Sequence, residues 1–181
     1  PPVRFTLERP PHLLVTSPRR EIKLLRTWLL SSDLSPEDMD IIEEQAESEE
    51  TSVLVEPLGG LATYPSIVRP GGNLKDTLIA VSHEWTHAYL FFHPLGRRYG
   101  SDYEMTILNE MVATMTGKEI GDLAYRRYYA PAGAETSKVE KPSSDFTQEM
   151  RKIRRAVDEY LARGETSEAE AYMEERRQFL A

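Results

Sequence analysis

Two long apolar segments, residues 78–92 and 105–116, are the feature that most constrains how this chain can fold. Helices that are apolar nearly all round are expected to be buried, and a buried charge without a partner costs several kcal/mol. Apart from one tyrosine, the charged or readily titratable side chains of these segments are His83, Glu84, His87 and Glu110. Buried groups of this kind pair with one another or bind a metal ion. The sequence therefore predicts a polar centre between two packed helices.

His83, Glu84 and His87 have the spacing His-Glu-x-x-His, which is typical of zinc sites. On a helix, residues i and i+4 project from one face, so both imidazoles can reach one metal ion. Glu84 lies to the side, where it can hydrogen-bond a water on the metal without being a ligand. Glu110 follows His87 by 23 residues, which leaves a loop long enough to fold the second helix back against the first. We predict one zinc ion per chain, held by His83, His87 and Glu110, with Glu84 as the general base.

The amino-acid composition limits which metal ligands and which kinds of partner this protein can have. The chain has no cysteine, so any metal must be held by histidines and carboxylates. A net charge of −8 argues against a nucleic-acid partner, because proteins that bind nucleic acids normally present a basic face.

No apolar run in the sequence reaches the roughly 18 residues needed to span a bilayer. The chain begins with Pro1 rather than Met, which is compatible with a removed signal peptide or membrane anchor and leaves the compartment undecided.

The apolar pattern predicts an α+β fold. Strands are expected at residues 3–7, 13–15, 52–57 and 61–68, with a turn at 59–60. Ser17-Pro18 and Ser35-Pro36 each supply an N-cap and a proline at the first helical position, so a helix is expected after each. Further helices are expected over 73–92, with Asn73 as its cap, over 103–117, and around 125–129, with a loop at 94–102.

The C-terminal part is expected to be a helical hairpin over residues 145–181. Its first helix carries an apolar stripe at helical spacing, which favours core packing rather than a cofactor site. Ser167 and Glu170 have the spacing of a capping box for its second helix. Residues 130–144 are rich in Pro, Ala, Ser and charge and are predicted to be a linker or flexible loop. Residues 1–129 would then form a metallopeptidase-like catalytic domain.

The zinc pattern, followed downstream by Asn109-Glu110-x-x-Ala113, resembles the gluzincin metallopeptidases, the group that includes thermolysin and the zinc aminopeptidases. The resemblance covers residues 61–117. It implies a small N-terminal α/β subdomain with an edge strand above the active-site helix, and a helical C-terminal part. It also implies zinc-dependent hydrolysis of a peptide or protein substrate, whose backbone could add to the strand at 61–68.

The resemblance also suggests roles for residues around the centre. Asn109 is a possible contact for the substrate backbone. Gluzincins usually have a Tyr or His that donates a hydrogen bond to the developing oxyanion, and the possible residues here are Tyr125, Tyr128, Tyr129, His93 and Tyr99. Thermolysin-like enzymes carry an Asp four residues after the Glu ligand, to orient a ligand histidine, where this chain has Thr114. The acid by which the aminopeptidases bind a substrate's amino terminus is absent from residues 59–64.

Three other interpretations stay open at this point. The histidines could be core residues bonded to carbonyl groups, with Glu110 capping a neighbouring element. The protein could be a zinc-stabilised, non-hydrolytic interaction module whose C-terminal hairpin binds a partner. A hydrolase acting on a bond other than a peptide would use the same ligands.

Overall fold

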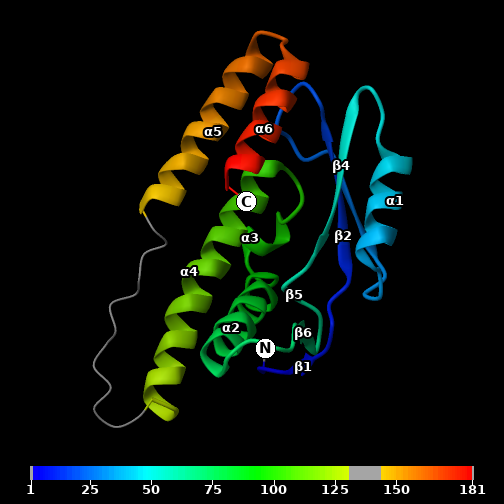
Figure 1. The fold of residues 1–181 in the computed structure, drawn as a ribbon. Coiled ribbons are helices and arrows are strands. Elements are labelled where there is room, and N and C mark those ends of the chain that lie inside the picture. Colours follow the sequence, from blue (N-terminus) through cyan, green and yellow to red (C-terminus); the bar gives the residue numbers. More distant parts are fainter. Residues whose placement is uncertain (1, 131–143, 181) are drawn as a thin grey trace.

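The computed structural model describes residues 2–130 and 144–180, and this part of the chain is a mixed α and β fold (Figure 1). Its strands are β1 (Phe5–Leu7), β2 (His12–Pro18), β3 (Arg26–Leu30), β4 (Thr51–Pro57), β5 (Gly60–Leu61) and β6 (Ser66–Val68). Its helices are α1 (Pro36–Ala46), α2 (Leu74–Leu90), α3 (Pro94–Arg97), α4 (Tyr103–Tyr128), α5 (Ser144–Ala162) and α6 (Thr166–Leu180). None of the described helices combines the length and apolar composition needed to cross a bilayer.

The larger sheet is antiparallel and has the order β3-β2-β4. The central strand β2 and its neighbour β4 contribute Leu14 and Val55, both buried. Helix α1 covers β4 from outside (Figure 1), and the Val55 amide donates to Glu43 Oε1 of that helix at 2.6 Å. Ser35 caps α1 through a capping box with Asp38, and Pro36 stands at its start, as the sequence predicts.

The smaller sheet has the order β1-β6-β5 and lies against α2. Strand β6 is central: it pairs in parallel with β1 and antiparallel with β5. Its Val68 is only 1% exposed, because β6 packs directly on the helix. Strand β5 is left with an unpaired edge in this sheet, close to the middle of α2.

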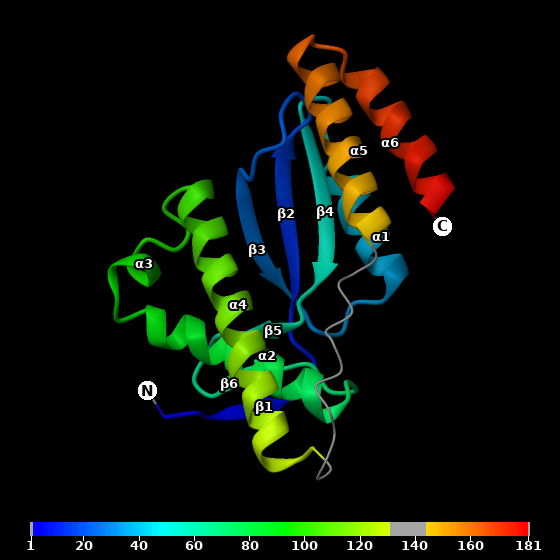
Figure 2. The same cartoon turned by 90° about the vertical axis from the view of Figure 1, so that its left-hand side faces the viewer.

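Helices α2 and α4 form the principal helix pair, with α4 crossing α2 in Figure 2. Asn73 caps α2 by accepting from the Asp76 amide, as expected. On α4, Ala113 and Gly117 face α2, and both are buried. A Cβ atom at Gly117 would stand 2.8 Å from His83 Cα, so only glycine permits this approach of the two backbones. The helix that carries Glu110 is thereby held against the helix that carries the histidines.

Several sequence predictions of local structure are wrong. The chain after Pro18 forms β3 instead of a helix, because pairing with β2 outweighs the helical spacing of the apolar residues there. Helix α4 is continuous to Tyr128 instead of two pieces, since its glycines serve close packing rather than ending the helix. The expected loop at 94–102 contains the short helix α3, and Gly60 of the expected turn belongs to β5. The expected strand at 61–68 is divided into β5 and β6, and of these two only β5 is an edge strand.

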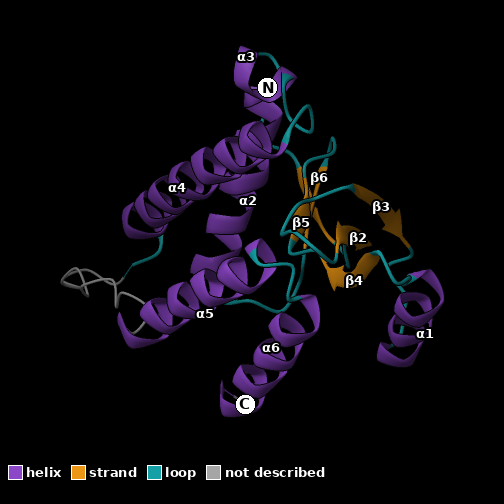
Figure 3. Cartoon of the chain, turned by 90° about the horizontal axis from the view of Figure 1, so that it is seen from above, coloured by secondary structure: helices purple, strands orange, loops and turns teal. Residues whose placement is uncertain are grey.

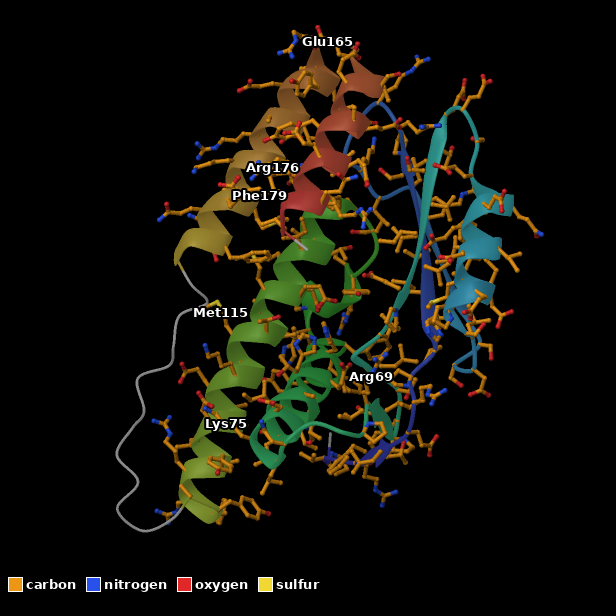
Figure 4. The ribbon with its side chains drawn as sticks, viewed as in Figure 1. Arg69, Lys75, Met115, Glu165, Arg176 and Phe179 are labelled. Carbon is orange, nitrogen blue, oxygen red and sulfur yellow. The ribbon has the colours of Figure 1, made fainter. Side chains whose placement is uncertain are left out.

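Helices α5 and α6 form the predicted hairpin, whose core is Ile153, Val157 and Ala169. Figure 3 shows the two helices next to each other, and Figure 4 shows Glu165 at the tip of the hairpin with Arg176 and Phe179 on α6. Ser167 lies inside α6, and the Glu170 carboxylate accepts two hydrogen bonds from Arg19, at 2.7 and 2.8 Å, instead of capping the helix. Most of the predicted linker, residues 131–143, lies outside the described residues.

Candidate metal centre

Three side chains from two helices converge on one point. His83 and His87 project from one face of α2, and their Nε2 atoms are 3.0 Å apart. Glu110 projects from α4, and its Oε2 atom lies 3.5 Å from each of these nitrogens. Among the described residues, these three form the one group of His, Asp and Glu side chains with the geometry to hold a metal ion.

The triangle of donor atoms fits a tetrahedral zinc ion. Zinc binds histidine nitrogen and carboxylate oxygen at about 2.0–2.2 Å, so two donors at a tetrahedral angle should lie about 3.3–3.6 Å apart. The two separations between Glu110 Oε2 and the histidine nitrogens, 3.5 Å each, match this edge length, and the separation between the two nitrogens, 3.0 Å, is shorter by about 0.3 Å. Around a zinc ion, these three donors would leave the fourth position of a tetrahedron open, as in catalytic rather than structural zinc sites.

Asn109 orients His87. Its Oδ1 atom lies 2.7 Å from His87 Nδ1, while its Nδ2 group points to the Leu95 carbonyl at 3.5 Å. This orientation of the amide makes His87 Nδ1 the donor, so the neutral ring turns the lone pair of Nε2 toward His83 and Glu110. Asn109 is 1% exposed, so its amide serves His87 and is not free for the expected contact with a substrate backbone. At least one of the two histidines therefore has an orienting partner, although Thr114 stands where thermolysin-like enzymes carry an Asp.

The electrostatics of the centre match its geometry. Hydrogen bonds to His83 and His87 hold the pKa of Glu110 well below its usual range. Burial disfavours a charged His87, but the hydrogen bonds to Glu110 and Asn109, together with the negative charges of Glu110 and Glu84, outweigh burial and raise the pKa of this imidazole. Without a metal ion, the centre therefore contains an anionic Glu110 carboxylate that favours a positive charge on the His87 ring. A zinc ion would supply that charge in place of a proton.

Glu84 lies beside the ligands and is buried, with 8% of the residue exposed. Burial raises the pKa of its carboxyl group, which is the direction required of a group that accepts a proton near neutral pH. Its carboxylate packs against the backbone of Gly60 on β5, where a side chain would collide with it. The charge partners that act on Glu84 are His83, His87 and Glu110.

Tyr99, in the turn between α3 and α4, reaches the centre. Its hydroxyl donates to Glu110 Oε1 at 2.9 Å, and its ring meets the His87 ring edge-on with centroids 5.8 Å apart. Burial, followed by its bond to Glu110, raises the pKa of the phenol, so Tyr99 keeps its proton. His93, another possible oxyanion donor, contacts Tyr89 instead, at 4.5 Å between ring centroids.

Tyr125, Tyr128 and Tyr129 do not reach the centre. Tyr125 follows Glu110 by 15 residues on the same helix. At about 1.5 Å of rise per residue, this places it about 22 Å away along the helix axis. Tyr128 and Tyr129 lie farther along and are 75% and 55% exposed. The sequence predicts a helix that ends at Gly117. It therefore does not show that these three tyrosines lie far along the same helix from Glu110, whereas Tyr99 lies close to it.

The centre opens into a cavity of about 1540 Å³ between the larger sheet and helices α2 and α4. Aliphatic and aromatic side chains line most of it, among them Leu13, Val15, Leu29, Ile79 and Phe92. Its polar lining includes His83, His87, Glu84 and Glu110, and charged side chains elsewhere on its wall are Lys23, Glu56 and Asp76. An apolar cavity with a few convergent polar groups is the usual form of a ligand site.

Comparisons of the chain with protein-family models, with curated proteins and with solved structures find no match. The likeness to the gluzincins accordingly rests on the motifs within residues 61–117.

Proposed function

We propose that this protein is a zinc-dependent peptidase in which His83, His87 and Glu110 hold one zinc ion per chain. The convergence of their three donor atoms is the observation that carries the proposal. Two neutral imidazoles and one carboxylate are also the donor set of several hydrolytic zinc enzymes. The centre faces an apolar cavity large enough for several residues of an extended peptide.

Each residue of the centre has a distinct part in hydrolysis. A bound zinc ion supplies a Lewis acid that polarises the scissile carbonyl and lowers the pKa of the attacking water. Glu84 accepts the proton of that water and later delivers it to the leaving amine. Tyr99, whose hydroxyl donates to Glu110 Oε1, replaces the more distant tyrosines as the candidate oxyanion donor, and it would turn its proton from Glu110 to the developing negative charge. Asn109 keeps the His87 lone pair turned toward the metal.

The proposal includes a division of the chain. Residues 1–129 would be the catalytic domain, built as a small N-terminal α/β subdomain above the active-site helix α2 and a helical part behind it. The unpaired edge of β5, which contacts α2, supports this arrangement, since a peptide backbone can add to such an edge. The substrate would be a peptide or protein lying along β5 and entering the apolar cavity.

A second proposal is a zinc-stabilised interaction module that does not hydrolyse anything. Exposed aromatic side chains on the hairpin favour it, since Phe146 and Phe179 are 53% and 71% exposed. The two proposals differ in turnover: the module would bind zinc and leave every peptide intact.

Turnover of a mixed peptide library tests the proposed function. We expect cleavage at internal or terminal peptide bonds, its loss after chelation, and its return when zinc is restored in stoichiometric amount. Mass spectrometry of the products reports which bonds are cut. A zinc-loaded, folded protein that leaves the library uncut would favour the interaction module. If that protein instead cleaves ester or amide bonds in compounds other than peptides, it would be a hydrolase with a different class of substrate.

A further inference from the structure

Gly60 lies against the side chain of Glu84 rather than against its backbone. A Cβ atom at Gly60 would overlap Glu84 Oε1, would stand 2.7 Å from Glu84 Cδ and would lie 2.9 Å from Cγ. The overlapped atoms belong to the flexible end of a side chain, which can move without unfolding the protein. The neighbouring Gly59 differs, since a Cβ atom there would meet nothing within 4 Å.

The strand that carries Gly60 is held in place. Gly60 pairs with Val68 of β6, which is 1% exposed and packs on α2. The Arg69 amide also donates to the Gly59 carbonyl at 3.1 Å, and its guanidinium donates to the Leu58 carbonyl at 2.9 Å. Figure 4 shows Arg69 at this end of the sheet. Strand β5 therefore cannot move away from Glu84 without breaking these contacts.

The helix that carries Glu84 is held from the other side. The backbone of His83 rests on Gly117 of α4, where a Cβ atom would stand 2.8 Å from His83 Cα. This turn of α2 thus lies between two glycines, Gly117 beneath its backbone and Gly60 against its side chain. With strand and helix both fixed, an added methyl group at Gly60 can be accommodated only by moving the Glu84 carboxylate.

We infer that Gly60 is a positioning residue, whose missing side chain sets the place of the Glu84 carboxylate beside the metal ligands. The inference rests on the proposed function, because it assigns Gly60 an effect on the proton acceptor of hydrolysis. Since β5 also offers the edge to which a peptide backbone would add, one short strand fixes both the base and its substrate. A displacement of about 1 Å in such an arrangement can cost about 10²-fold in rate.

Gly60→Ala and Gly59→Ala form a matched pair of variants that tests this inference. We expect Gly60→Ala to bind one zinc ion like the parent protein and to lower kcat about 10- to 100-fold with little change in KM. Gly59→Ala should match the parent protein in all three measurements. Equal kcat values in the two variants would overturn the inference, whereas a parent protein without turnover would instead overturn the proposed function.

A double-mutant cycle separates positioning from a general structural defect. Once Glu84→Gln has removed the base, Gly60→Ala should not lower the residual rate further, because its effect acts through that carboxylate. A defect of the fold would lower both backgrounds by the same factor and contradict the inference. If Gly60→Ala does not fold alone, it should fold and bind zinc when combined with Glu84→Ala, which removes the overlapped atoms. Failure of this pair to fold as well would also overturn the inference.

Discussion

Glu84→Gln is expected to retain zinc and the fold while losing peptide hydrolysis by about 10²–10⁴-fold, the usual contribution of a general base. The amide has nearly the shape of the carboxylate and can still hydrogen-bond water, but it cannot take the proton. Glu84 is not among the three converging donors, so metal binding should persist. The measurement is kcat on a peptide cleaved by the parent protein, with zinc content determined on the same samples.

Zinc content decides how this variant is interpreted. A Glu84→Gln protein that is fully loaded with zinc and turns over like the parent protein would show that Glu84 is not the base. If the variant loses zinc together with activity, Glu84 acts as a ligand instead, and the assignment of the three donors would need to change.

Glu110→Ala is expected to weaken zinc binding by more than about 100-fold. Loss of a residue that merely orients a ligand costs about 10–100-fold in metal affinity, and Glu110 would be a ligand itself. It is also the only anionic member of the converging set, so its removal leaves two neutral imidazoles. Thermal unfolding with and without zinc provides the measurement, since a bound ion stabilises the folded state by an amount that grows with the logarithm of its concentration divided by Kd.

Glu119→Ala is the matched control, because Glu119 is an exposed acid on the same helix and is not part of the donor group. It should keep the zinc-induced rise in Tm, whereas Glu110→Ala should lose it. An equal rise in Tm for both variants would show that Glu110 does not bind the metal.

The centre was predictable from sequence because its residues are polar exceptions in apolar helices. The i, i+4 spacing brings His83 and His87 together on any helix, and Glu110 needed only a helix folded back on the first. The sequence predicts that Asn109 contacts the substrate backbone, because nothing in its position along the chain shows that its amide turns inward to His87. That orientation depends on how α4 packs, which is a tertiary property.

The fold was less predictable where tertiary contacts override local pattern. The residues after Pro18 have apolar side chains at helical spacing, yet pairing with β2 makes them a strand. Gly117 reads as the end of a helix in sequence, but in the structure it admits the backbone of His83. Gly60 likewise reads as a turn residue, and only the packing of β5 on α2 brings it to Glu84. In each case the deciding partner is distant in sequence.

The zinc content of the protein tests the central claim most directly. Protein purified without added metal and analysed for its elements should contain about one equivalent of zinc per chain, as the three donors with one open position require. Less than about a tenth of an equivalent, even after incubation of the folded protein with zinc, would contradict the assignment of His83, His87 and Glu110 as a zinc centre.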